Sequence, residues 1–146
     1  MNTHAVQLDR PPPYGAPLTL AQAKRVMAKA EAEAQANNWP VAIVIVDSAG
    51  DIVLALKSDQ TQHSSMGIAT GKAMTAVNFR RPTKMFQDGI AEGGSGLRFL
   101  AVPGVTPLEG GFPILVEGHV VGGIGVSGVL SSQDAQVALA GMTALA

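Results

Sequence analysis

Cysteine is absent from the 146-residue chain, which excludes disulfide bonds, thiolate metal sites and cysteine nucleophiles. Charge is also scarce: charged residues make up 14% of the sequence and the formal net charge is −1, whereas about a quarter of residues are charged in typical domains. A surface this poor in charge favours association, so we expect a homo-oligomer. Lysine and arginine are not in excess and form no basic run, which argues against a nucleic-acid partner.

Long apolar runs are lacking as well. None reaches the roughly 18 residues that a membrane span requires, and the start of the chain has neither the basic region nor the apolar core of a secretory signal. The sequence therefore predicts a cytoplasmic protein without membrane contact. Aromatic residues account for only 4% of the chain, against a hydrophobic fraction of 47%. That fraction is rich in alanine and valine, whose small side chains suit tight packing.

Proline, by contrast, is concentrated near the start, where residues 10–17 contain four of the nine prolines. This composition is extended and cannot form a helix. We therefore expect residues 1–17 to form a proline-rich arm and residues 18–146 to form a single domain. The arm either lies on its own subunit or crosses onto a neighbouring one.

The middle of the chain alternates between helical and extended patterns. Helical spacing follows Thr19, a good N-cap, and stops at Asn37-Asn38. Residues 41–47 are a continuous β-branched run typical of a central strand buried on both faces, and residues 52–57 complete a hairpin with it. Further helices are predicted at 66–79 after Ser64-Ser65, at 84–89 after Thr83, and at 133–144 after Ser131-Ser132. Asp47 either caps the hairpin turn or serves as a site carboxylate.

The chain from Gly110 to Gly128 is predicted to be a second hairpin, with strands at 114–116 and 120–126 and a three-residue turn. Three glycines weaken the second strand of this hairpin. Glycines are useful in a strand where a helix, a bulge or a ligand must come close to the backbone. Residues 89–96 are expected to be a mobile loop and residues 97–102 a further strand. The whole pattern indicates an α+β fold, an antiparallel sheet flanked by helices.

Several segments, in this order and spacing, together resemble the GlcG/HbpS family. They are Val46-Asp47 before Gly50, Ser65 with Lys72 to Ala76, Phe79 with Pro82-Thr83, Gly110-Gly111 with Pro113-Ile114, and Gly125 to Gly128 leading to Gln133-Asp134. The resemblance covers about residues 18–141. It implies a five-stranded antiparallel sheet between helices in a profilin-like arrangement, and homo-oligomers such as tetramers or octamers.

The resemblance also implies a ligand. Family members include extracellular haem-binding proteins and the C-terminal domain of PduO-type corrinoid adenosyltransferases, so haem or a related tetrapyrrole is the implied small molecule. The family pattern places Thr75 and Thr83 near the proposed pocket. The helical histidine of some PduO-type domains has no counterpart, because residues 20–37 contain no histidine.

Three residues are candidates for proton transfer: Glu109, His63 and Lys72. Lys72 shares one helix face with Ser65, near His63. A serine that caps the helix and a lysine that is solvated or ion-paired would show the same spacing. Glu109 precedes Gly110-Gly111, where backbone N–H groups can approach an anion and the carboxylate can act as a general base. No metal site is predicted, since the histidines lack the spacing of metal ligands.

Arginines would hold a carboxylate or a haem propionate by bidentate bonds. The candidate ligand-binding residues are Ser65, Thr75, Phe79, Arg80, Thr83, Arg98, Gly110, Gly111 and Ser127. Two functions follow from the sequence. The first is a haem- or tetrapyrrole-binding protein, with its pocket between the 65–79 helix and the glycine-rich hairpin. The second is a catabolic lyase, hydratase or tautomerase acting on a small organic acid, and the sequence leaves open whether the protein is an enzyme.

Overall fold

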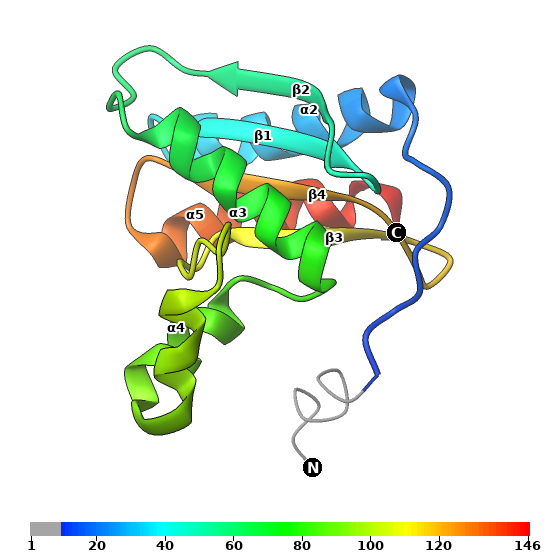
Figure 1. Ribbon diagram of the computed structural model, residues 1–146. Coiled ribbons are helices and arrows are strands. Elements are labelled where there is room, and N and C mark those ends of the chain that lie inside the picture. Colours follow the sequence, from blue (N-terminus) through cyan, green and yellow to red (C-terminus); the bar gives the residue numbers. More distant parts are fainter. Residues whose placement is uncertain (1–9) are drawn as a thin grey trace.

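A four-stranded antiparallel sheet in the order β2-β1-β4-β3 lies at the centre of the computed structural model, which describes residues 10–146 (Figure 1). The strands are β1 (Ala42–Asp47), β2 (Ile52–Lys57), β3 (Gly111–Val116) and β4 (His119–Ser127). The helices are α2 (Leu20–Ala36), α3 (Ser65–Phe79), α4 (Lys84–Glu92) and α5 (Ser131–Met142), with 3-10 segments η1 (Gly94–Ala101) and η2 (Thr143–Leu145). The predicted α+β class and both hairpins are confirmed.

The expected fifth strand is absent from this sheet. Residues 97–102, predicted to be extended, lie almost entirely in η1. The predicted mobile loop, residues 89–96, is divided between the end of α4 and the start of η1. The reason is a tertiary contact. The Phe99 ring packs edge-on against Phe86 of α4, with centroids 5.0 Å apart, and Gly96 lies directly against the backbone of Gly89. The segment folds back on α4 and does not reach a sheet edge, so the five-stranded expectation is wrong for this chain.

Helices cover both faces of the sheet. In Figure 1, α3 crosses the front face, and α2 and α5 lie behind it. The side chains of Ile43 and Ile45 belong to the core with α2 and α5, whereas Val44 and Val46 pack with α3. This alternation confirms that β1 is a central strand buried on both faces. Among the helices within residues 10–146, none has the length and apolar composition that crossing a membrane requires.

The glycines of β4 make room for α3. A Cβ added at Gly123 would lie 2.6 Å from the carbonyl oxygen of Ala73, and one at Gly125 would overlap the carbonyl of Ala69. At Gly123 and Gly125 the close partner is therefore the helix, and next to Gly122 the β3–β4 pairing also contains a bulge. The turn between β3 and β4 has two residues, Glu117 and Gly118, both with positive φ as in a type I′ turn. The predicted three-residue turn was one residue too long.

Only one of the predicted hydroxyl caps forms. Thr19 Oγ1 accepts a hydrogen bond from the Gln22 N–H at 3.1 Å, and the Gln22 side chain accepts one from the Thr19 N–H at 2.8 Å. Ser64 and Thr83 precede α3 and α4 without capping them through their side chains. At α5, Gln133 accepts from the backbone N–H of Leu130. Asp47 caps the β1–β2 turn by accepting from two backbone N–H groups, those of Ala49 and Asp51.

The described part of the proline-rich arm packs on the sheet of its own chain. Gly15 donates to the carbonyl of Val120 at 2.9 Å, and the Val120 N–H donates to Pro13 at 2.8 Å. The Tyr14 hydroxyl donates to the carbonyl of Val77 at 2.7 Å, at the end of α3. Residues 1–9 of the predicted arm lie outside the described residues.

Candidate functional site

A pocket of about 580 Å³ lies between the α4–η1 unit and the start of β3, and we call it the first chamber. In Figure 1 this unit projects from the body of the fold below α3. Its wall combines apolar and charged side chains: Arg81, Pro82, Lys84, Met85, Phe86, Asp88, Gly89, Glu92, Arg98, Phe99, Glu109, Gly110, Gly111 and Phe112. A volume in this range is typical of small-molecule and cofactor sites.

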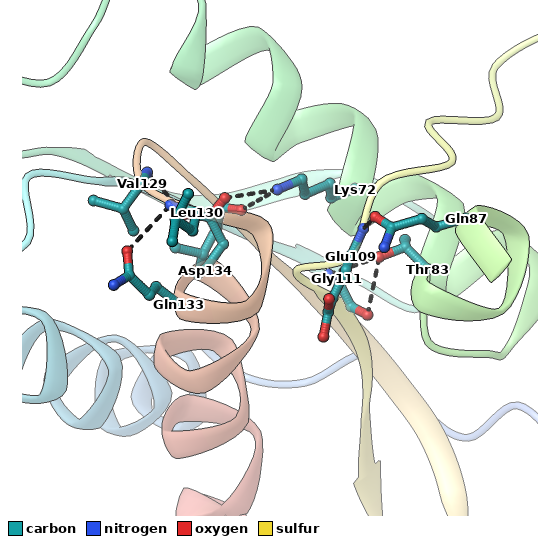
Figure 2. Close-up of polar contacts among 10 residues, drawn as sticks. Lys72, Thr83, Gln87, Glu109, Gly111, Val129, Leu130, Gln133 and Asp134 are labelled. Atoms are coloured by element: carbon teal, nitrogen blue, oxygen red, sulfur yellow. Dashed lines mark hydrogen bonds and ion pairs between the residues drawn. The ribbon is translucent and has the colours of Figure 1, made fainter. Parts of the chain in front are cut away.

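Hydrogen bonds from Thr83 and Gln87 connect α4 to the segment that enters β3. Thr83 donates its N–H to the carbonyl of Gly111 at 3.0 Å, and its hydroxyl accepts from the Gly111 N–H at 2.9 Å. One turn further on, the Gln87 side chain accepts from the Glu109 N–H at 2.9 Å. Figure 2 shows both connections. Thr83 is therefore not on the chamber wall, but it positions the residues that are. Glu109 is fixed at the wall through its backbone N–H, which binds the Gln87 side chain.

Aromatic side chains, together with Pro82 and Met85, form the apolar part of the chamber. Phe86 is buried between two rings, Phe79 and Phe99, each with its centroid 5.0 Å away in an edge-to-face arrangement. Phe112 of β3 supplies a further ring on the wall. Phe79, a predicted ligand residue, supports the chamber through Phe86.

Charges in the first chamber balance each other. The wall holds three basic residues, Arg81, Lys84 and Arg98, and three acidic ones, Asp88, Glu92 and Glu109. Lys84 and Asp88 form an exposed ion pair at 2.8 Å, and the hydrogen bond to Asp88 raises the pKa of Lys84. The chamber as a whole therefore favours neither an anion nor a cation strongly.

A buried ion pair lies beneath the chamber floor. Lys72 Nζ contacts Asp134 Oδ2 at 3.0 Å and the carbonyl of Val126 at 2.8 Å, while Asp134 Oδ1 accepts from the Val129 N–H (Figure 2). Desolvation by burial lowers the pKa of Lys72 and raises the pKa of Asp134, and the attraction between the two charges opposes both changes. Gly110 covers the pair, since a Cβ there would lie 2.8 Å from Lys72 Nζ. The Lys72 amine thus connects α3 to β4 and α5 beneath the chamber.

The structure brings four of the sequence-predicted site residues to the first chamber: Arg98, Glu109, Gly110 and Gly111. The space predicted for the pocket, between α3 and the hairpin, is filled by the close packing at Gly123 and Gly125.

The other predicted residues lie elsewhere. His63 is exposed in the turn before α3, and Ser127 is buried at the end of β4. Thr75 binds the loop before β3, donating to the carbonyl of Gly104 and accepting from the Thr106 N–H. The Ser65 hydroxyl is buried and finds no hydrogen-bond partner within residues 10–146. Arg80 stacks its guanidinium over the Tyr14 ring and donates to Pro12.

Sequence reasoning missed most of the chamber wall on α4 and η1. The missed residues are Lys84, Met85, Phe86, Asp88, Gly89, Glu92 and Phe99, together with Phe112 on β3. The adjacent apolar pair Met85-Phe86 in the short predicted helix was the available signal, because that helix has too little other apolar surface to pack as an ordinary core element.

The fold and the chamber define an α+β protein with a ligand-sized pocket beside an antiparallel sheet. The sequence model of the HbpS-like family, described as haem degrading protein HbpS-like, matches residues 18–143. This chain belongs to that family, as the sequence resemblance indicated.

Individual relatives agree with this assignment. Protein GlcG from Escherichia coli (strain K12) is 37% identical over 110 residues, covering 75% of this chain and 81% of that protein. The crystal structure of a double mutant of Streptomyces reticuli HbpS superposes with a TM-score of 0.82 at 31% identity, covering 90% of this chain and 89% of the other. A crystal structure of a PduOC–haem complex gives a TM-score of 0.79 at 26% identity, covering 88% and 95%.

Proposed function

We propose that this protein binds haem or a related tetrapyrrole, with the macrocycle in the first chamber. The observation that carries the proposal is the 580 Å³ pocket with three phenylalanines, Phe86, Phe99 and Phe112, on its wall. A flat apolar macrocycle gains from aromatic contact and from removal of its faces from water. A similar structure, PduOC, is a complex with haem, which supports the same ligand class here.

The chamber also offers a side chain suited to the metal. Met85 lines it, and a methionine thioether is one of the protein ligands that hold haem iron. His63 and His119 are exposed outside its wall. When bound, haem would supply redox and ligand-binding chemistry at its iron, and Met85 would hold that iron.

Titration of the purified protein with hemin tests the proposal. We expect a saturable change in the Soret band, and at least a tenfold weaker affinity (about 1.4 kcal/mol) for Gly89→Leu. At Gly89 an added Cβ meets only the Phe99 ring, at 3.7 Å, so a leucine there fills the chamber without opposing the fold. His63→Ala is the matched control outside the chamber and should bind like the wild type. Absence of a saturable change, or equal affinity in Gly89→Leu, would contradict this location.

Met85→Leu tests the iron ligand separately. Leucine keeps the volume of methionine at a small cost, about 1.5 kcal/mol or less, but has no sulfur. We expect hemin still to bind, with a shifted Soret maximum and altered ferrous spectrum. Identical spectra for the variant and the wild type would eliminate Met85 as the ligand while leaving the chamber as the binding site.

We also propose that the protein self-associates, as the low charge content predicts. Leu97, Leu100 and Val102 are exposed on η1 and just after it, with Leu100 66% exposed, and exposed apolar residues gathered in one segment favour a protein interface. Light scattering should give the mass of an oligomer for the wild type and a lower mass for Leu100→Glu. A monomeric wild type would refute self-association.

The expected cytoplasmic location stays a prediction.

The enzyme alternative now depends on Glu109. Its position on the chamber wall among Arg81, Lys84 and Arg98 would suit proton transfer to a small organic acid. Lys72 lies below the floor and His63 lies outside the wall, so neither shares the chamber with Glu109. Binding therefore has the stronger support.

A further inference from the structure

The Glu109 carboxylate stands without a partner on the wall of the first chamber, where the residue is half-buried. Within residues 10–146 this carboxylate forms neither a hydrogen bond nor an ion pair. The hydrogen bond that Glu109 does form runs from its backbone N–H to the Gln87 side chain. A partly buried polar group that the protein leaves unpaired calls for an explanation.

Positive side chains share the wall, but each is engaged elsewhere. Lys84 pairs with Asp88 at 2.8 Å, and the Arg98 guanidinium stacks over the Phe99 ring, 5.4 Å from its centroid. Arg81 also has an interaction of its own. The unpaired carboxylate can therefore accept a hydrogen bond from a ligand without displacing a side chain that already holds it.

The main chain at Glu109 is fixed from two directions. On one side the Gln87 side chain accepts from the Glu109 N–H at 2.9 Å (Figure 2). On the other side the carbonyl of the next residue, Gly110, accepts from the Val126 N–H at 3.0 Å. A side chain that extends from a fixed backbone loses less conformational entropy when it binds a ligand.

A ligand that fills the first chamber removes water from the Glu109 carboxylate. That loss costs free energy unless the ligand supplies a donor in place of the water. The rings of Phe86, Phe99 and Phe112 on the same wall favour a flat aromatic body, and such a body carries its donors as ring N–H groups. In haem the iron replaces the pyrrole hydrogens, whereas an open-chain tetrapyrrole keeps pyrrole N–H groups.

We infer that Glu109 accepts a hydrogen bond from a pyrrole N–H of the ligand and thereby selects metal-free, open-chain tetrapyrroles. This inference rests on the proposed function and adds which tetrapyrroles satisfy the chamber. Glu109 is then a specificity-determining residue. A site that contains a buried acceptor discriminates against an analogue without the matching donor, because the acceptor is left unpaired.

The test compares biliverdin with hemin, since both carry propionates but only biliverdin has pyrrole N–H groups. Glu109→Met keeps a side chain of similar length and offers only a weak acceptor. We expect the variant to bind biliverdin about ten- to a hundredfold more weakly, the range for a lost hydrogen bond to a charged group. Its hemin affinity should be unchanged or higher, because hemin offers the carboxylate no donor.

Glu31→Met is the matched control. Glu31 is a half-buried glutamate on α2 and lies outside the chamber wall, so this variant should bind both ligands like the wild type. Three results would overturn the inference: wild-type protein that binds hemin but not biliverdin, undiminished biliverdin affinity in Glu109→Met, or an equal loss of both ligands in that variant.

A second experiment separates this inference from the proposed function. Indole and 1-methylindole are small flat probes that differ in one N–H, and their binding is followed through the Gly110 and Gly111 amide resonances by NMR. We expect the wild type to bind indole about threefold or more tightly, and Glu109→Met to bind the two equally. With that result, failure of every tetrapyrrole to bind would refute only the proposed function. Equal binding of the two probes by the wild type, or no binding of either, would refute the acceptor role of Glu109.

Discussion

Gly125→Val is expected to destabilise the protein by about 3 kcal/mol or more, and to lower the melting temperature by roughly 10 °C. A side chain at Gly125 would run into the backbone of α3, at Ala69 and at the N–H of Ala73, 2.6 Å from the added Cβ. Backbone cannot rotate aside as a flexible side chain can, so either α3 moves off the sheet or β4 distorts. Chemical denaturation followed by circular dichroism measures the loss.

Gly67→Ala is the control on the facing helix. Gly67 is exposed on α3, and a Cβ there meets nothing within 4 Å. The substitution should therefore stabilise the protein by about 0.5–1 kcal/mol, the helix-propensity gain of alanine over glycine. If Gly125→Val unfolds at the same denaturant concentration as the wild type, α3 does not pack on β4 as closely as described.

Lys72→Met is expected to cost about 3–5 kcal/mol, because it leaves the Asp134 carboxylate buried without its cation. Lys72 and Asp134 are only 1% and 2% exposed, so water cannot replace the lost partner. Lys84→Met is the control: it breaks an exposed ion pair of similar length and should change stability by about 0.5 kcal/mol or less. The double variant Lys72→Met/Asp134→Asn removes both charges and keeps an acceptor for Val129, so its loss should shrink to about 1–2 kcal/mol.

The loss in Lys72→Met should also depend on pH. Burial raises the pKa of Asp134 above its ordinary value of 3.8, and without Lys72 the hydrogen bond from the Val129 N–H is left to oppose that rise. The folded variant then keeps a proton that the unfolded chain releases, so its stability falls as the pH rises through the raised pKa. The variant should approach the wild type more closely near about pH 5 than near about pH 8. A loss as small as that of Lys84→Met at both values would show that the buried pair contributes little.

The candidate site was only partly predictable from the sequence. Gly110-Gly111 and Glu109 were identified because a glycine pair beside a carboxylate is a local signal, and all three lie at the first chamber. The partner of Lys72 was not identified, since Asp134 is 62 residues away in the chain. A lysine on a helix face has the same spacing whether it reaches a ligand or a buried carboxylate.

The sequence by itself determined the elements whose signals are local: the Thr19 N-cap of α2, the buried run of β1, both hairpins and the need for close approach at the glycines of β4. Periodicity and turn chemistry act over a few residues, so they are readable in a single chain. Only the tertiary structure decided the rest. Residues 97–102 have strand-like composition, yet the contact of Phe99 with Phe86 folds them into η1 beside α4. That same contact creates the first chamber, and packing between distant segments leaves no periodic signal in the sequence.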